Sequence, residues 1–180
     1  DLHSFPTRRS SDLVVAYPKN AKNPLTESTI LDFENYNNNF GYEHTKILGE
    51  MQCKSFAEEF AMKISVIRSD NTYGPNDNFD LESSHVLPAL IRKFHEAKLN
   101  NDPSVQVWGT GKARREFMHV TDLAKACLFL MEEYDEAGLL NAGTGEDITI
   151  EDLALTVRDI VGYEGGITFD TSKPDGTPRK

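Results

Sequence analysis

The 180-residue sequence is poor in the features that mark several protein classes. It has two cysteines, Cys53 and Cys127, in segments predicted to be helical, which favours reduced thiols over a disulfide framework or a metal site. No apolar run approaches the roughly 20 residues needed to cross a bilayer. Positive charge is scarce, because 19 Lys and Arg stand against 29 Asp and Glu. The net charge of −10 disfavours nucleic acid and anionic lipid, so we expect a cytoplasmic globular protein that binds neither.

The first 13 residues, DLHSFPTRRSSDL, have no helical or strand period. They resemble the in-frame translation of a sequencing-adapter oligonucleotide, so we expect residues 1–13 to be a non-native scar. The alternative is a native basic, Ser-rich targeting arm. Native sequence would then start inside a predicted strand, residues 14–17, which is followed by a predicted surface loop at 19–39.

Helical and strand patterns alternate along the rest of the chain. Helices are expected at 41–60, around 87–94, after a capping Thr121, and after a capping Thr149 with Leu153, Val157, Ile160 and Val161 facing inward. Further strands are expected at 62–67, 105–108, 116–120, 138–141 and 167–169, with loops at 70–80 and 109–111. The alternation predicts an α/β fold with a largely parallel sheet.

Tyr42 and Lys46 are four residues apart, so on a helix they share one face. A nearby cation stabilises a tyrosinate, which lets a tyrosine act as general acid or base near neutral pH. Such a pair also occurs by chance on many helix surfaces. The spacing alone therefore leaves surface decoration open as the simpler interpretation.

Long ordered blocks resolve part of that ambiguity. They are Tyr17-Pro18-Lys19, the Tyr42 to Lys46 motif, Asn71 with Tyr73-Gly74-Pro75, NDNFDLESSHVLPALIRKFHEAK, VWGTG, REFMHVTDLAKA and DTSKPDGTPRK. From Val14 to Lys180 the chain resembles the extended short-chain dehydrogenase/reductase family, in particular GDP-L-fucose synthases and related sugar-nucleotide epimerases.

The resemblance implies a partial Rossmann-type parallel sheet with a small α/β substrate-binding subdomain. Residues 14–75 would be the last part of the dinucleotide-binding domain, and 76–180 mainly the sugar-nucleotide subdomain, with some elements returning to the sheet. The Gly-rich turn that cradles the cofactor pyrophosphate is absent from the sequence. We therefore expect the chain as written to bind NADP(H) weakly and to be inactive, and the full-length parent to be an enzyme and a homodimer.

By resemblance, the activity would be 3,5-epimerisation and NADPH-dependent 4-reduction of GDP-4-keto-6-deoxy-D-mannose, with NAD(H) as the other possible cofactor. Tyr42 would donate a proton to the 4-oxygen, and Lys46 would also hold the nicotinamide ribose. His85 would be the acid for epimerisation, since imidazole exchanges protons near neutral pH. The structural alternative for His85 is a helix-entry residue, with Ser83 or Ser84 as the cap. The expected cofactor-binding residues are Lys46, Ser69, Asp70, Asn71, Thr72 and His85.

The same resemblance implies a set of substrate-binding residues, namely Lys93, Trp108, Arg115, Asp175 and Lys180. Guanidinium groups bind diphosphate oxygens in a bidentate manner, and an indole can cover a base or a sugar. The alternative for the basic residues is an ordinary solvated face. A local basic cluster in an acidic chain nevertheless favours a phosphate ligand.

The sequence departs from the family at several positions. Lys93 stands where an arginine is usual, and Ser69, Asp70 and Thr72 replace the usual Pro-Thr-Asn-Leu residues around Asn71. Leu13, Val14 and Val15 occupy the usual Ser-Ser-Cys positions, whose cysteine is the base partner of the histidine. Two other functions therefore stay open: another sugar-nucleotide epimerase or dehydratase, and a non-catalytic binding protein of the same fold.

Overall fold

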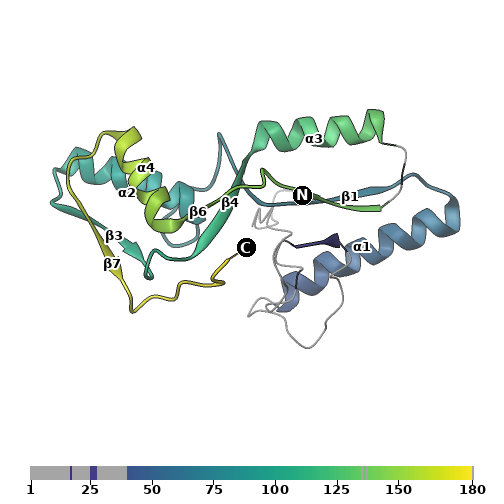
Figure 1. Ribbon diagram of the computed structural model, residues 1–180, viewed down its shortest axis with the longest axis horizontal. Helices are drawn as coiled ribbons and strands as arrows, with labels where there is room; N and C mark the ends of the chain where they lie inside the picture. Colours follow the sequence, from purple (N-terminus) through teal and green to yellow (C-terminus); the bar gives the residue numbers. More distant parts are fainter. Residues whose placement is uncertain (1–16, 18–24, 28–39, 135, 137, 180) are drawn as a thin grey trace, which may run out of the picture. The chain divides into compact units, whose positions relative to one another are not determined.

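The computed structural model describes residues 17, 25–27, 40–134, 136 and 138–179, which form parts of two compact units (Figure 1). The first unit takes its described residues from 1–72 and 121–143, and the second from 73–120 and 144–180. The expected scar, the expected strand at 14–17 apart from Tyr17, and most of the expected loop at 19–39 lie outside the described residues.

The first unit contains α1 (Phe40–Phe60), β1 (Ser65–Ser69), β5 (Gly138–Ala142) and nearly all of α3 (Val120–Glu133). The segment of α1 lacks proline, so its backbone ladder runs unbroken for 21 residues. Strands β1 and β5 pair in parallel, from Ser65 opposite Gly138 to Ser69 opposite Ala142. None of the described helices is long and apolar enough to cross a bilayer.

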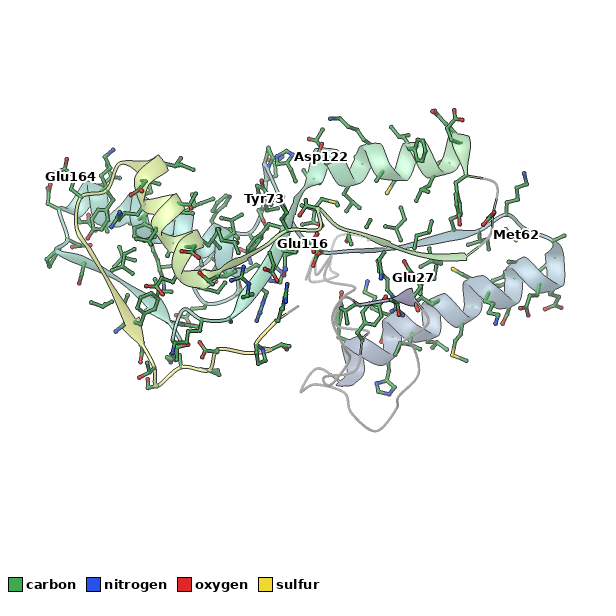
Figure 2. All side chains as sticks on the ribbon, viewed as in Figure 1. Glu27, Met62, Tyr73, Glu116, Asp122 and Glu164 are labelled. Atoms are coloured by element: carbon green, nitrogen blue, oxygen red, sulfur yellow. The ribbon has the colours of Figure 1, made fainter. Side chains whose placement is uncertain are left out.

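The second unit contains α2 (Val86–Asn100), β3 (Ser104–Trp108), β4 (Arg114–His119), β6 (Asp147–Thr149), α4 (Ile150–Val161) and β7 (Gly166–Asp170). Strand β3 pairs in parallel with β7, and β4 pairs antiparallel with β6. Strand β2 (Asn71–Tyr73) lies on the other side of β4. Tyr73 of β2 packs edge-on against Phe117 and His119 of β4. Figure 2 labels Tyr73 and also Glu116, which belongs to β4.

Helices α2 and α4 pack side by side and supply most of one hydrophobic core (Figure 1). Phe94 and Ala154 are fully buried there, at 0% exposure. The ends of α4 follow from its sequence. The Thr149 hydroxyl accepts a hydrogen bond from the backbone N–H of Asp152, and α4 ends at Gly162 in the left-handed conformation.

The predicted α/β class is confirmed, with helices and two parallel strand pairs in the expected places. Several local predictions were wrong. The predicted loop at 70–80 contains β2, the predicted strand at 62–67 lies at Ser65–Ser69, and the short strand β6 was missed. Thr121 is not a cap, because α3 begins at Val120. Ile160 is 80% exposed and does not face inward, whereas Leu153 and Val157 are buried.

Candidate functional site

Tyr42 and Lys46 lie on successive turns of α1, and both are half-buried. The Lys46 ammonium nitrogen lies 5.2 Å from the centre of the Tyr42 ring, as the four-residue spacing requires. The next residue, Ile47, is 3% exposed, so this stretch of the helix packs within the first unit. The cation and the phenol are therefore adjacent on a helix face that is only partly open to solvent.

An ion pair ties α1 to the neighbouring strand one turn beyond Lys46. The Arg68 Nε and Nη2 atoms of β1 donate to the two Glu50 carboxylate oxygens at 2.7 and 2.6 Å. The Arg68 side chain is 0% exposed, and its guanidinium also lies 4.5 Å from the Tyr17 ring centre. Burial opposes the charge on Arg68, but Glu50 and Tyr17 together outweigh it and raise the pKa of Arg68 above its ordinary value. The pair fixes the helix that carries Tyr42 and Lys46.

Polar residues follow β1 at its carboxyl end. Ser69 and Asp70 are buried, and the Asp70 N–H donates to the Ala142 carbonyl at 3.3 Å, continuing the ladder with β5. The Thr72 hydroxyl donates to the Asp70 carbonyl at 3.1 Å. The carboxyl ends of parallel strands are where open α/β sheets bind their ligands. Buried polar residues at this place, in the unit that carries Lys46, fit the polar part of a nicotinamide cofactor.

The second unit contains a cavity of about 220 Å³. Four of the five residues expected to bind substrate meet at its wall, although they come from α2, β3, β4 and the segment after β7. These four are Lys93, Trp108, Arg115 and Asp175. The rest of the lining is Ser84 and eight apolar residues, namely Leu81, Val86, Ala89, Leu90, Val107, Ala113, Ile150 and Pro174. An apolar cavity with a few convergent polar groups is typical of a small-molecule site.

Two lysines lie close to the Trp108 ring, which is 49% exposed. Their ammonium nitrogens are 5.3 Å (Lys93) and 5.2 Å (Lys173) from the ring centre. The Lys93 ammonium also donates to the Gln106 carbonyl at 3.1 Å, and burial lowers its pKa. Lys173 was not among the residues expected from the sequence. The indole therefore lies within reach of two cations from separate elements.

Arg115 and Asp175 hold the segment after β7 in place. Arg115 Nη1 donates to the carbonyls of Arg114 and Thr177 at 2.7 and 2.6 Å. The Asp175 carboxylate accepts from the Thr110 N–H at 2.6 Å and the Thr110 hydroxyl at 2.8 Å. The Thr110 N–H, followed by its hydroxyl and the charge of Arg115, lowers the pKa of Asp175. In this arrangement both residues shape the cavity wall through contacts within the chain.

A second set of hydrogen bonds holds the segment after β7 near its end. Asp147 of β6 accepts hydrogen bonds from Arg114 at 2.7 Å and from Arg179, and the Arg114 N–H donates to the Pro178 carbonyl at 2.8 Å. The Arg114 guanidinium, more than Arg179, lowers the pKa of Asp147. Residues 171–179 are thus held at both Asp175 and Arg179, and Pro174 and Asp175 of this segment line the cavity.

His85 belongs to the second unit, where it occupies the N-cap position of α2 in extended conformation. The expectation that Ser83 or Ser84 caps this helix was wrong. The Ser83 hydroxyl donates instead to Asp80 at 2.8 Å, and the His85 side chain makes no cap bond. Ser84 lines the cavity, and its buried hydroxyl has no hydrogen-bond partner among the described residues. Lys180 lies outside the described residues.

Comparison with known proteins places this geometry in a family. Residues 10–143 match the sequence pattern of the NAD dependent epimerase/dehydratase family. The chain belongs to this family. Among curated members, GDP-L-fucose synthase 1 of Arabidopsis thaliana is 47% identical over 164 residues, 91% of this chain and 51% of its own length. GDP-L-fucose synthase of Escherichia coli K12 is 45% identical over 173 residues, 91% of this chain and 54% of its own length. The chain therefore spans about half the length of these epimerase/dehydratase family members.

Solved structures agree with the fold. A GDP-L-fucose synthetase from Naegleria fowleri bound to NADP is 29% identical and covers 92% of this chain and 54% of its own, with a TM-score of 0.85. A GDP-6-OMe-4-keto-L-xylo-heptose reductase from Campylobacter jejuni is 34% identical and covers 92% and 59%, with a TM-score of 0.81. The Rossmann-like α/β fold class expected from the sequence is therefore confirmed for the chain.

Sequence reasoning missed four residues around these sites. Arg68 gave no signal, because a lone arginine in a strand is normally exposed and its partner is 18 positions away. Thr110 was missed because its partner, the expected residue Asp175, is 65 positions away and the contact has no local pattern. Lys173 and Ser84 lie inside motifs that resemble the epimerase/dehydratase family. Their place in those motifs could have marked them as candidate site residues.

Proposed function

We propose that the chain comes from an NADP-dependent sugar-nucleotide epimerase and reductase that converts GDP-4-keto-6-deoxy-D-mannose to GDP-L-fucose. The observation that carries the proposal is the cavity of the second unit, where Lys93, Trp108 and Arg115 line an apolar pocket. The curated relatives named GDP-L-fucose synthase support the choice of nucleotide and sugar.

In the reduction, Tyr42 gives its phenolic proton to the 4-oxygen of the keto sugar, while the cofactor supplies the hydride that reaches C4. The products are a 4-hydroxyl group and NADP⁺, and the tyrosine regains its proton from solvent. Lys46, 5.2 Å from the Tyr42 ring centre, stabilises the negative charge that develops on the phenolic oxygen. Lys46 also donates to the nicotinamide ribose.

The proposed cofactor is NADP(H), and the residues that would hold its nicotinamide end are Lys46, residues 69–72 and, by resemblance to the family, His85. The buried polar residues Ser69 and Asp70 at the end of β1 support this placement. A relative's structure with NADP bound supports the choice of dinucleotide. The first unit thus takes the role of the dinucleotide-binding domain, and the second unit that of the substrate-binding subdomain.

In the epimerisation steps, His85 exchanges protons at C3 and C5 of the sugar. Its family partner is a cysteine, and the aligned position here is Val15, which lies outside the described residues and carries no titratable group. This departure favours a second candidate function. Another NAD(P)-dependent sugar-nucleotide epimerase or dehydratase would keep Tyr42 and Lys46 and dispense with the cysteine.

The nucleotide end of the substrate lies in the cavity of the second unit. The indole of Trp108 covers the sugar or the base, and Lys93, Arg115 and Lys180 supply positive charge for the diphosphate. Asp175 positions the wall through its two hydrogen bonds to Thr110. We also propose a cytoplasmic homodimer; the free cysteines Cys53 and Cys127 are consistent with a reducing compartment.

The test is NADPH oxidation by the full-length protein with a panel of nucleotide 4-keto sugars. We expect turnover with the GDP sugar, and a fall in kcat of at least about 100-fold in Tyr42→Phe, because general acid catalysis contributes about 10² to 10⁴. His44→Gln, on the same helix, is the matched control and should keep its kcat. Activity with uridine or thymidine sugars alone would contradict the GDP assignment. A Tyr42→Phe enzyme as active as wild type would contradict the mechanism.

A further inference from the structure

Glu50 follows Lys46 by one helical turn on α1, so the two side chains are neighbours on the helix surface. The same spacing forms an ion pair elsewhere on this helix, where the Lys54 ammonium lies 3.9 Å from the Glu58 carboxylate. Among the described residues, no ion pair joins Lys46 to Glu50. The Lys46 ammonium lies instead 5.2 Å from the centre of the Tyr42 ring. A lysine whose charge serves a tyrosine thus has an acidic neighbour that could neutralise it.

Arg68 of β1 occupies both oxygens of the Glu50 carboxylate. Its Nε and Nη2 atoms donate to Oε1 and Oε2 at 2.7 and 2.6 Å, a bidentate geometry that arginine forms and lysine cannot. The pair is removed from water, because the Arg68 side chain is 0% exposed and that of Glu50 is 13% exposed. Solvent and salt therefore screen it less than an exposed pair on one helix. The carboxylate of Glu50 is bound to Arg68 and not to Lys46.

Tyr17 and Glu27 also interact with Arg68, and both are held by Asn141 of β5. The Arg68 guanidinium lies 4.5 Å from the centre of the Tyr17 ring, and the Tyr17 hydroxyl donates to Asn141 Oδ1 at 2.6 Å. The Glu27 carboxylate accepts from the Asn141 N–H at 2.9 Å. This hydrogen bond, more than the charge of Arg68, lowers the pKa of Glu27. Neither group displaces Glu50 from the Nε and Nη2 edge of the guanidinium.

We propose that Arg68 is a positioning residue for the Tyr42–Lys46 pair, because by holding both carboxylate oxygens it prevents Glu50 from neutralising Lys46. The inference rests on the proposed function, since the charge of Lys46 serves catalysis only if Tyr42 is the proton donor. With Glu50 held, Lys46 keeps its charge for the phenolic oxygen, where a nearby cation stabilises a tyrosinate. A Glu50 carboxylate that has lost its arginine would pair with Lys46 and weaken that stabilisation.

The first measurement is the rate at which an amine-acylating reagent modifies Lys46 in this chain, followed by mass spectrometry at mildly alkaline pH. Only the neutral amine reacts, and a carboxylate partner keeps the ammonium charged. We expect Arg68→Met to slow modification of Lys46 about three- to tenfold, because the freed Glu50 carboxylate pairs with it. Adding Glu50→Gln to Arg68→Met is the matched control, and it should bring the rate within about twofold of wild type. Lys54, on the same helix, should react at one rate in all three proteins.

Unfolding of the Arg68→Met chain is distinguishable, because it would speed modification of Lys46 and Lys54 alike and not slow it at Lys46 alone. In that case Arg68→Gln, which keeps a polar group at the buried position, is compared with Arg68→Gln plus Glu50→Gln. The Lys46 rate should again be lower in the variant that keeps the Glu50 carboxylate. Equal Lys46 rates with and without that carboxylate would overturn the role of Arg68.

The second measurement is the pH profile of kcat in the full-length protein with the GDP 4-keto sugar. Tyr42 must be protonated to act as general acid, so activity falls as it ionises at alkaline pH. We expect Arg68→Met to lower kcat about three- to tenfold and to move this alkaline limb to higher pH, and added Glu50→Gln to reverse both changes. A lower kcat with an unmoved limb, as for a purely structural role, would overturn the inference. A wild-type enzyme without turnover would overturn the proposed function and the catalytic half of this inference, whereas equal labelling rates would overturn the inference alone.

Discussion

The two units bury different kinds of residue. Twelve buried residues of the second unit form one apolar cluster, centred on Phe94 and Ala154 at 0% exposure. The buried residues described in the first unit are Tyr17, Ile47, Arg68, Ser69 and Asp70, three of them polar or charged. Helix α3 has no buried residue within its described length, and Phe129 and Met131 on it are 61% and 82% exposed.

This difference indicates what stabilises each unit. The second unit removes apolar surface from water within its own residues, which is the main favourable term in folding. The described part of the first unit depends more on a buried ion pair. Such a pair contributes only while both partners are present, because a lone buried charge is strongly unfavourable. The unit that carries the Tyr42–Lys46 pair is therefore the more sensitive to loss of a single polar contact.

The largest effect should come from emptying the apolar core. We expect Phe94→Ala to destabilise the second unit by about 3 to 5 kcal/mol, because it removes a buried ring and leaves a cavity. Denaturant unfolding followed by Trp108 fluorescence measures it. Leu99→Ala on the same helix is 68% exposed and should change stability by less than about 0.5 kcal/mol. Equal effects of the two substitutions would contradict the placement of the core.

The next effect concerns the ion pair of the first unit. We expect Arg68→Met to cost roughly 2 to 4 kcal/mol, near the lower part of the range for a broken buried pair, since Glu50 retains 13% exposure. Amide hydrogen exchange of α1 and β1 measures it. Combining Arg68→Met with Glu50→Leu should restore most of the protection, because an apolar pair leaves no buried charge. A double variant as labile as the single one would refute the ion-pair account.

A smaller effect should come from alanine at two glycines, one of which contacts Asp175, and should separate backbone strain from that contact. Gly109 and Gly145 have similar φ values, +81° and +80°, so alanine at either costs about 1 to 2 kcal/mol. A Cβ on Gly109 would lie 2.2 Å from the Asp175 carboxylate, whereas a Cβ on Gly145 meets nothing within 4 Å. We expect Gly109→Ala to lower both stability and GDP affinity more than Gly145→Ala does. Equal losses would show that the Asp175 contact is unimportant.

The smallest effect is a dependence on pH. The folded pKa of Asp175 is lowered, so its stabilising contribution is complete above the unfolded value of about 3.9 and is lost as pH falls through the lower folded value. Asp175→Asn should therefore destabilise the second unit near neutral pH and flatten its loss of stability in acid. Thermal melts between pH 2 and about 7 measure this. Parallel curves for wild type and variant would contradict it.

Local patterns predicted those features that depend on neighbouring residues. The Thr149 cap was predictable because a threonine hydroxyl can accept a hydrogen bond from the backbone N–H three residues later, here that of Asp152. Helix α1 was predictable because its segment lacks proline. The short strands β2 and β6 escaped, because three residues are too few to show a period. Ile160 keeps helical spacing but lies beyond the reach of the core at the end of α4.

The candidate site likewise has one part that a local pattern predicts and another that depends on the tertiary fold. The pairing of Tyr42 with Lys46 follows from spacing on one helix, whereas the meeting of Lys93, Trp108, Arg115 and Asp175 at one cavity needs the tertiary fold. The resemblance named these four residues without the contacts that hold them. That Asp175 binds Thr110, and that Lys173 faces Trp108, depends on pairing of β3 with β7.

The central claim is that the second unit holds the nucleotide by itself, while the first unit carries the Tyr42–Lys46 pair. Hydrogen exchange of the chain with and without GDP tests it most directly, because protection reports local stability segment by segment. We expect GDP to protect residues 104–116 and 171–179 and to leave α1 unchanged. Protection confined to α1, or no protection anywhere at saturating GDP, would contradict it.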